Sequence, residues 1–91
     1  MNKELIMIEF TERERALILN LTMVDPAVSD RLQKAQLNES KKISILMRID
    51  ELEDTLENVA ADANHSKSKK LGRELDRLYE KLQSIMDANA F

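Results

Sequence analysis

The chain has 91 residues and a formal net charge of −3, enough for one small domain with a modest core. Hydrophobic residues make up 43% of the chain but aromatic residues only 3%, so we expect an aliphatic core. Because cysteine is absent, disulfides and thiolate metal sites are excluded. The excess of acidic residues argues against a protein that binds nucleic acid by neutralising phosphates.

The apolar runs are short and are interrupted by charges, which argues against a transmembrane helix. Glu4 and Glu9 interrupt the pattern of a secretory signal at the N-terminus. We therefore expect a cytoplasmic protein with no membrane partner.

Residues 1–10 are predicted to form an N-terminal arm. In an extended chain Ile6, Ile8 and Phe10 would share one face, with Leu5 and Met7 on the other. No second strand is expected in this sequence. The arm is therefore predicted to pack on the helices or to pair with another chain.

Residues 11–37 are predicted to form two short helices. Thr11 and Glu14 have the spacing of a capping box, which predicts a helix that begins after Thr11 and continues to Val24. Asp25-Pro26 should end this helix, and Asp25 is a suitable N-cap for a second one over residues 26–36.

Residues 38–91 are predicted to form a long helical hairpin. Asn38 is the expected N-cap of a helix over residues 39–63, a turn is expected at residues 64–66, and a second helix should run over residues 66–88. Apolar residues recur at steps of four and three, the spacing of helices that pack along their length. They are Ile45, Ile49, Leu52, Leu56, Val59 and Ala63 on the first side, and Leu71, Leu75, Leu78, Leu82 and Ile85 on the second.

Charges beside this seam also favour an antiparallel pair, because the first helix is mainly acidic and the second mainly basic. The register predicts that Asp50 lies near Lys81, Glu53 near Arg77, Glu57 near Arg73 and Asp62 near Lys69. Gly72 weakens the last helix, and we expect it to allow the close approach of a neighbouring group.

These elements predict an all-α fold in which two short N-terminal helices pack on one end of a long antiparallel helical hairpin, like a four-helix bundle. The short helices would cover only half of the hairpin. A second copy of the chain is the simplest cover for the rest. We therefore expect a homodimeric protein–protein interaction or assembly module without catalytic activity. The residues expected to bury the contact are Ile6, Ile8, Phe10, Leu46, Met47, Tyr79 and Met86.

Two other functions stay open. The first is a DNA-associated regulator that uses the two short helices as a helix-turn-helix, although the second helix offers only Arg31 and Lys34 as bases. The second is an anion-binding or enzyme-accessory subunit that uses the basic residues Lys67 to Arg73 at the start of the last helix, together with His65.

No metal or cofactor site is predicted. Asp62, Asn64 and His65 gather at the interhelical turn, but these residue types are also favoured by turns and helix caps. The acidic residues 50–57 lack the spacing and the glycine of an EF-hand loop, and the chain has no Glu-x-x-His motif for a di-metal bundle.

The segment Ala60-Ala61-Asp62-Ala63-Asn64-His65-Ser66, followed by Lys69-Lys70-Leu71, resembles a group of small bacterial helical proteins of unknown function. In that group a similar Ala-rich Asn-His-Ser/Thr turn joins two helices. The resemblance covers about residues 52–78. It implies a helical fold in a bacterial protein and gives no indication of an activity.

Overall fold

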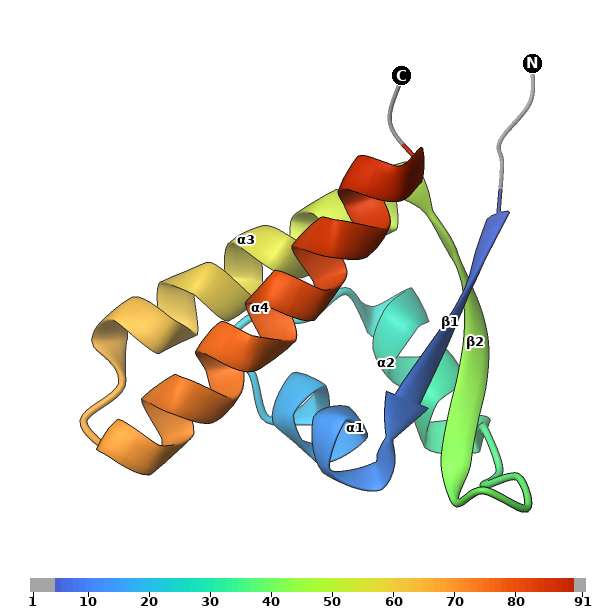
Figure 1. Ribbon diagram of the computed structural model, residues 1–91, viewed down its shortest axis with the longest axis horizontal. Coiled ribbons are helices and arrows are strands. Elements are labelled where there is room, and N and C mark those ends of the chain that lie inside the picture. Colours follow the sequence, from blue (N-terminus) through green and yellow to red (C-terminus); the bar gives the residue numbers. More distant parts are fainter. Residues whose placement is uncertain (1–4, 90–91) are drawn as a thin grey trace.

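The computed structural model describes residues 5–89, which form an α+β fold rather than the predicted all-α fold. The element order is β1 (Leu5–Thr11), α1 (Glu12–Leu19), α2 (Pro26–Lys34), β2 (Lys42–Arg48), α3 (Ile49–His65) and α4 (Lys69–Asn89). The two-stranded sheet of β1 and β2 lies on one side of the molecule and the α3–α4 pair on the other, with α1 and α2 between and below them (Figure 1). The four helices therefore enclose a core with a small sheet instead of forming a bundle.

The two strands pair antiparallel in the register that places Ile8 opposite Ile45. Successive side chains of a strand point to opposite faces of the sheet. The inner face buries Ile8, Phe10, Ile43, Ile45 and Met47 and partly buries Ile6. The predicted arm, of which residues 1–4 lie outside the described range, thus finds its partner strand within its own chain.

The prediction of one helix over residues 39–63 is wrong, because residues 42–48 form β2. In this segment Ile43, Ile45 and Met47 alternate with exposed residues, which is the period of a half-buried strand. Asn38 does not cap a helix: its side-chain oxygen accepts hydrogen bonds from the backbone N–H groups of Ser40 and Lys42 in the preceding turn. Lys41 has a φ of 61°, which places it in the left-handed region at this turn.

The predicted pairing of the last two helices is present. α3 and α4 run side by side in opposite directions (Figure 1). Their facing sides bury six aliphatic residues of the predicted seam: Leu52, Leu56, Val59, Leu75, Leu78 and Leu82. The turn between the helices follows His65, and the Ser68 hydroxyl accepts a hydrogen bond from the backbone N–H of Leu71 in the first turn of α4.

Both predicted caps of the short helices are confirmed. Thr11 and Glu14 form a reciprocal capping box at the start of α1. The Asp25 carboxylate accepts a hydrogen bond from the backbone N–H of Ala27, with Pro26 in the first position of α2. However, α1 ends at Leu19, so Val24 lies in the connection rather than in the helix.

The two strands, and the positions at which α1 and α3 begin directly after them, repeat with a period of 37 residues. Under this shift the pair Leu5–Arg48 becomes the pair Lys42–Thr11, which is also present in the sheet. The symmetry centre is therefore the pair Ile8–Ile45. The fold consists of two strand–helix–helix units, β1–α1–α2 and β2–α3–α4, whose strands pair symmetrically about this position.

The hydrogen bonds at the starts of α1 and α3 follow the same repeat. Glu14 accepts from the backbone N–H of Thr11, and its counterpart Glu51 accepts from the backbone N–H of Arg48. Each glutamate also binds a cation from the other unit. The same cation donates a second hydrogen bond to a backbone carbonyl oxygen of a strand. Lys81 of α4 binds Glu14 and the Glu9 carbonyl, while Arg31 of α2 binds Glu51 and the Leu46 carbonyl. These two cations join each strand to a helix of the opposite unit.

Candidate functional site

The outer face of the two-stranded sheet carries its most exposed apolar side chains. Leu5, Met7 and Leu46 are 55%, 62% and 43% exposed, respectively. The register places Met7 directly opposite Leu46, and cross-strand partners lie on the same face of the sheet. The three side chains therefore form one patch, which we call the outer-face patch.

A shallow hollow of about 640 Å³ joins this patch to α2. Its apolar lining comes from the outer-face patch and from Ile45 and Ala35. Its polar lining includes Asp30 and Lys34, which form an ion pair at 3.2 Å. An open apolar hollow with few polar groups is suited to another protein surface rather than to a charged small molecule.

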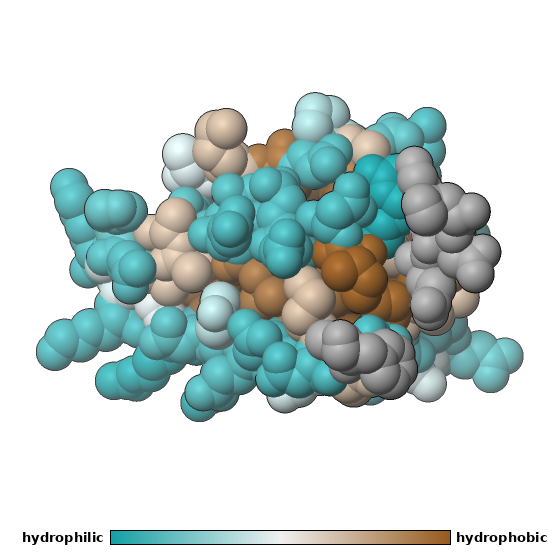
Figure 2. Space-filling view, turned by 90° about the horizontal axis from the view of Figure 1, so that it is seen from above, coloured by the Kyte–Doolittle hydropathy of each residue, from teal (hydrophilic) through white to brown (hydrophobic). Residues whose placement is uncertain are grey.

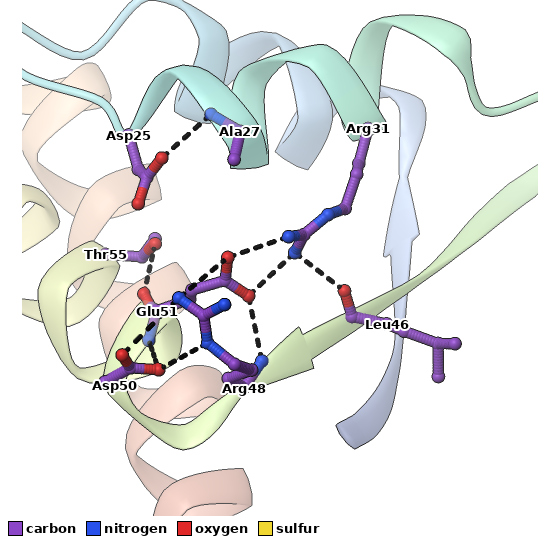
Figure 3. Close-up of polar contacts among 8 residues, drawn as sticks. All are labelled: Asp25, Ala27, Arg31, Leu46, Arg48, Asp50, Glu51 and Thr55. Carbon is purple, nitrogen blue, oxygen red and sulfur yellow. Dashed lines mark hydrogen bonds and ion pairs between the residues drawn. The ribbon is translucent and has the colours of Figure 1, made fainter. Parts of the chain in front are cut away.

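A network of ion pairs holds α2 against the sheet beside this hollow (Figure 3). Arg31 donates to both carboxylate oxygens of Glu51 at 2.7 and 2.8 Å and to the carbonyl oxygen of Leu46 at 3.0 Å. Arg48 bonds to Asp50 at 3.0 Å and lies 3.7 Å from the Glu51 carboxylate. Two arginines thus balance two carboxylates, one of which is buried.

The environment of Glu51 favours its charged form. Hydrogen bonds from Arg31 lower the pKa of the Glu51 carboxyl below its ordinary value, and they outweigh burial, which acts in the opposite direction. The backbone N–H of Arg48 adds a further hydrogen bond that lowers this pKa. The outcome is a charged and paired group at the junction of β2 and α3.

The seven residues predicted to form a contact surface are divided among three places. Ile8, Phe10 and Met47 lie in the core of the monomer and Ile6 packs against it, so they are directed away from the outer surface. Leu46 belongs to the outer-face patch. Tyr79 and Met86 line a separate groove between α3 and α4.

In the first strand the predicted contact residues face the core of the monomer. The exposed apolar residues of β1 are Leu5 and Met7, while Ile6, Ile8 and Phe10 face the core. The alternation of these residues was visible in the sequence, but alternation alone does not determine which face is buried. The available signal was the repeat at 37 residues, in which Ile43 and Ile45 match Ile6 and Ile8 and indicate two similar strands.

The predicted interhelical charge pairs are not formed in the structure. Asp50 pairs with Arg48, and Lys81 reaches Glu14 instead of Asp50 because α4 passes beside β1. The Asp62 carboxylate accepts a hydrogen bond from the backbone N–H of Thr22, which ties the α1–α2 connection to α3. Within residues 5–89, no cation lies within 4.0 Å of the carboxylates of Glu53 and Glu57.

The residues of the two alternative sites, for DNA and for an anion, lie in different environments. Arg31 and Lys34, the bases proposed for DNA contact, are both engaged in ion pairs with residues of this chain. The basic residues at the start of α4 are exposed, as is His65 at the end of α3. Within the described part of the chain, no group of three or more histidine, cysteine, aspartate or glutamate side chains is arranged to hold a metal ion.

None of the helices among residues 5–89 has the length and apolar character that crossing a membrane requires. Comparisons with protein-family models, with curated proteins and with solved structures found no match to this chain.

Proposed function

We propose that this protein is a small cytoplasmic assembly module that pairs with a second copy of itself through the outer-face patch. The observation that carries this proposal is the position of Leu5, Met7 and Leu46, three large apolar side chains that share the solvent side of a two-stranded sheet. Much of the surface of these side chains stays in contact with water in the monomer, and burying it under a second surface would stabilise a contact.

A second copy is the favoured occupant because a two-fold interface needs only one self-complementary patch. The flanks of the patch carry both signs of charge. Lys34 and Asp30 lie at the hollow and Arg48 follows Leu46 along the strand, so a rotated copy can set unlike charges opposite one another. A stable interface buries about 1,200 Å² or more in total. The patch would therefore be the centre of a contact that also covers the hollow beside α2.

Neither alternative function gains support from the observed geometry. Of the two bases of α2, Arg31 binds Glu51 of α3 and Lys34 pairs with Asp30 of its own helix. At the start of α4, one backbone N–H already bonds to Ser68. We therefore propose a binding role without catalysis and without a nucleic-acid partner.

The test is the solution mass, measured by light scattering behind size exclusion over a dilution series. The expected result is a mass twice that of the 10.5 kDa chain, falling toward the monomer on dilution. Met7→Glu should abolish the dimer because it places a charge at the centre of the patch. Met23→Glu is the matched control, since Met23 is 68% exposed but lies in the connection between α1 and α2.

A monomer at every concentration would refute the proposal. So would a dimer that persists unchanged in Met7→Glu. Circular dichroism of both variants would show that each remains folded.

A further inference from the structure

The solvent side of the α3–α4 pair carries a groove that the proposed dimer does not use. It has a volume of about 240 Å³, and its apolar lining is Leu56, Ala60, Tyr79 and Met86. Viewed from above, the molecule shows apolar surface running between bands of hydrophilic side chains (Figure 2). The outer-face patch lies on a different part of the molecule, so the two surfaces have separate roles.

The rim of this groove is acidic. Glu53 and Glu57 line one side of it and are exposed, one helical turn apart on the same face of α3. In the described chain neither has a cation within 4.0 Å. The opposite side carries Gln83, whose amide donates to the Asp87 carboxylate at 2.9 Å. Two like charges at this spacing destabilise a helix, and an opposite charge on a bound segment would remove this effect.

This charge disfavours a two-fold contact in which α3 of one copy lies against α3 of the other. Such a contact would place the rim glutamates of one chain against those of the other, and like charges across an interface oppose association. The groove instead suits a segment with apolar residues in the centre and cations on its flanks. We propose that it binds an amphipathic helix of another protein that carries lysine or arginine beside its apolar stripe.

The dimensions and side chains of the groove suit a helix. From Glu53 to Ala60 the groove follows α3 for about 10 Å, or two turns, which matches apolar residues at positions i, i+4 and i+7 of the ligand. The small side chain of Ala60 allows a helix to approach closely. Tyr79 offers a large partly exposed ring, and Met86 adapts its shape to different apolar partners.

Tyr79 makes the proposal directly measurable, because the chain has one tyrosine and no tryptophan. The probe is a synthetic helix of about 18 residues. It is built from leucine and lysine, with leucine at the stripe positions and lysine on both flanks. The expected result is a saturable change in tyrosine fluorescence that weakens as salt is raised. The double variant Glu53→Lys/Glu57→Lys should weaken binding by about tenfold or more, since the flanking lysines would then meet like charges.

The matched control is Glu39→Lys/Asp54→Lys, which changes the net charge equally. Both residues are exposed and lie outside the groove lining. A second variant, Ala60→Leu, fills the groove without altering charge and should also weaken binding. Circular dichroism would establish that the variants remain folded.

Three outcomes would overturn the proposal: no change in Tyr79 fluorescence, equal weakening in the control, or no effect of Ala60→Leu. The proposal would also fail if the protein alone were a dimer that Glu53→Lys/Glu57→Lys dissociated, because the occupant would then be a second copy. Since the dimer test uses Met7, failure at one surface leaves the result at the other intact.

Discussion

Replacing Glu51 by glutamine tests the idea that a buried, fully paired carboxylate joins the two halves of the fold. Glu51 is 3% exposed and accepts two short hydrogen bonds from Arg31. Glutamine keeps an oxygen for the backbone N–H of Arg48 but removes the charge. The Arg31 guanidinium, whose side chain is 35% exposed, recovers part of its hydration. Removing one partner of a buried pair costs about 3–5 kcal/mol, and this partial exposure reduces the expected loss to about 2–3 kcal/mol.

The chain supplies its own control through the repeat. Glu14 makes the same cap and binds Lys81 at 2.7 Å, but its side chain is 21% exposed. Glu14→Gln should therefore cost about 1 kcal/mol, because water compensates for much of the lost ion pair. The assay is urea unfolding followed by far-UV circular dichroism. In thermal unfolding, each kcal/mol should shift the midpoint by about 4–8 °C for a domain of this size.

The pH dependence follows from the same pair. The pKa of Glu51 is lower in the folded state than its ordinary value of 4.5, so the folded state binds fewer protons than the unfolded state near this pH. Its contribution to stability is complete above about pH 4.5 and is lost as the pH falls through the folded-state pKa. The difference between the wild-type protein and Glu51→Gln should accordingly shrink on acidification. A cost in Glu14→Gln equal to that in Glu51→Gln would refute the role of burial, and a pH-independent difference would refute the role of charge.

Further substitutions test the helix ends. Thr11→Ala should lower the free energy of unfolding by about 1 kcal/mol because α1 loses its side-chain cap, and urea unfolding that left stability unchanged would contradict this role. Gly72→Ala should raise the free energy of unfolding by up to about 1 kcal/mol, since a Cβ at this position would meet Ser66 at an ordinary contact distance of 3.9 Å. This corrects the expectation that Gly72 allows close approach of a neighbour. A loss of thermal stability in Gly72→Ala would restore that expectation.

The sequence by itself determined the features that depend on neighbouring residues. The capping box at Thr11, the Asp25-Pro26 helix start and the α3–α4 seam all arise from side chains within a few turns of one another. Such interactions leave a local pattern that can be recognised without the fold.

The tertiary structure decided the features that depend on distant residues. Ile45 and Ile49 have the spacing of a helix, but Ile45 also belongs to an alternating segment typical of a strand. This segment forms β2 because β1 provides hydrogen-bond partners for its backbone groups. The same pairing determines that Leu5 and Met7 are exposed while Ile6, Ile8 and Phe10 are covered. Lys81 likewise reaches Glu14 across 67 residues, a contact that the sequence of either helix does not indicate. Strand pairing and ion pairs between remote segments are selected by the whole packed fold, because a short segment satisfies several local patterns equally well.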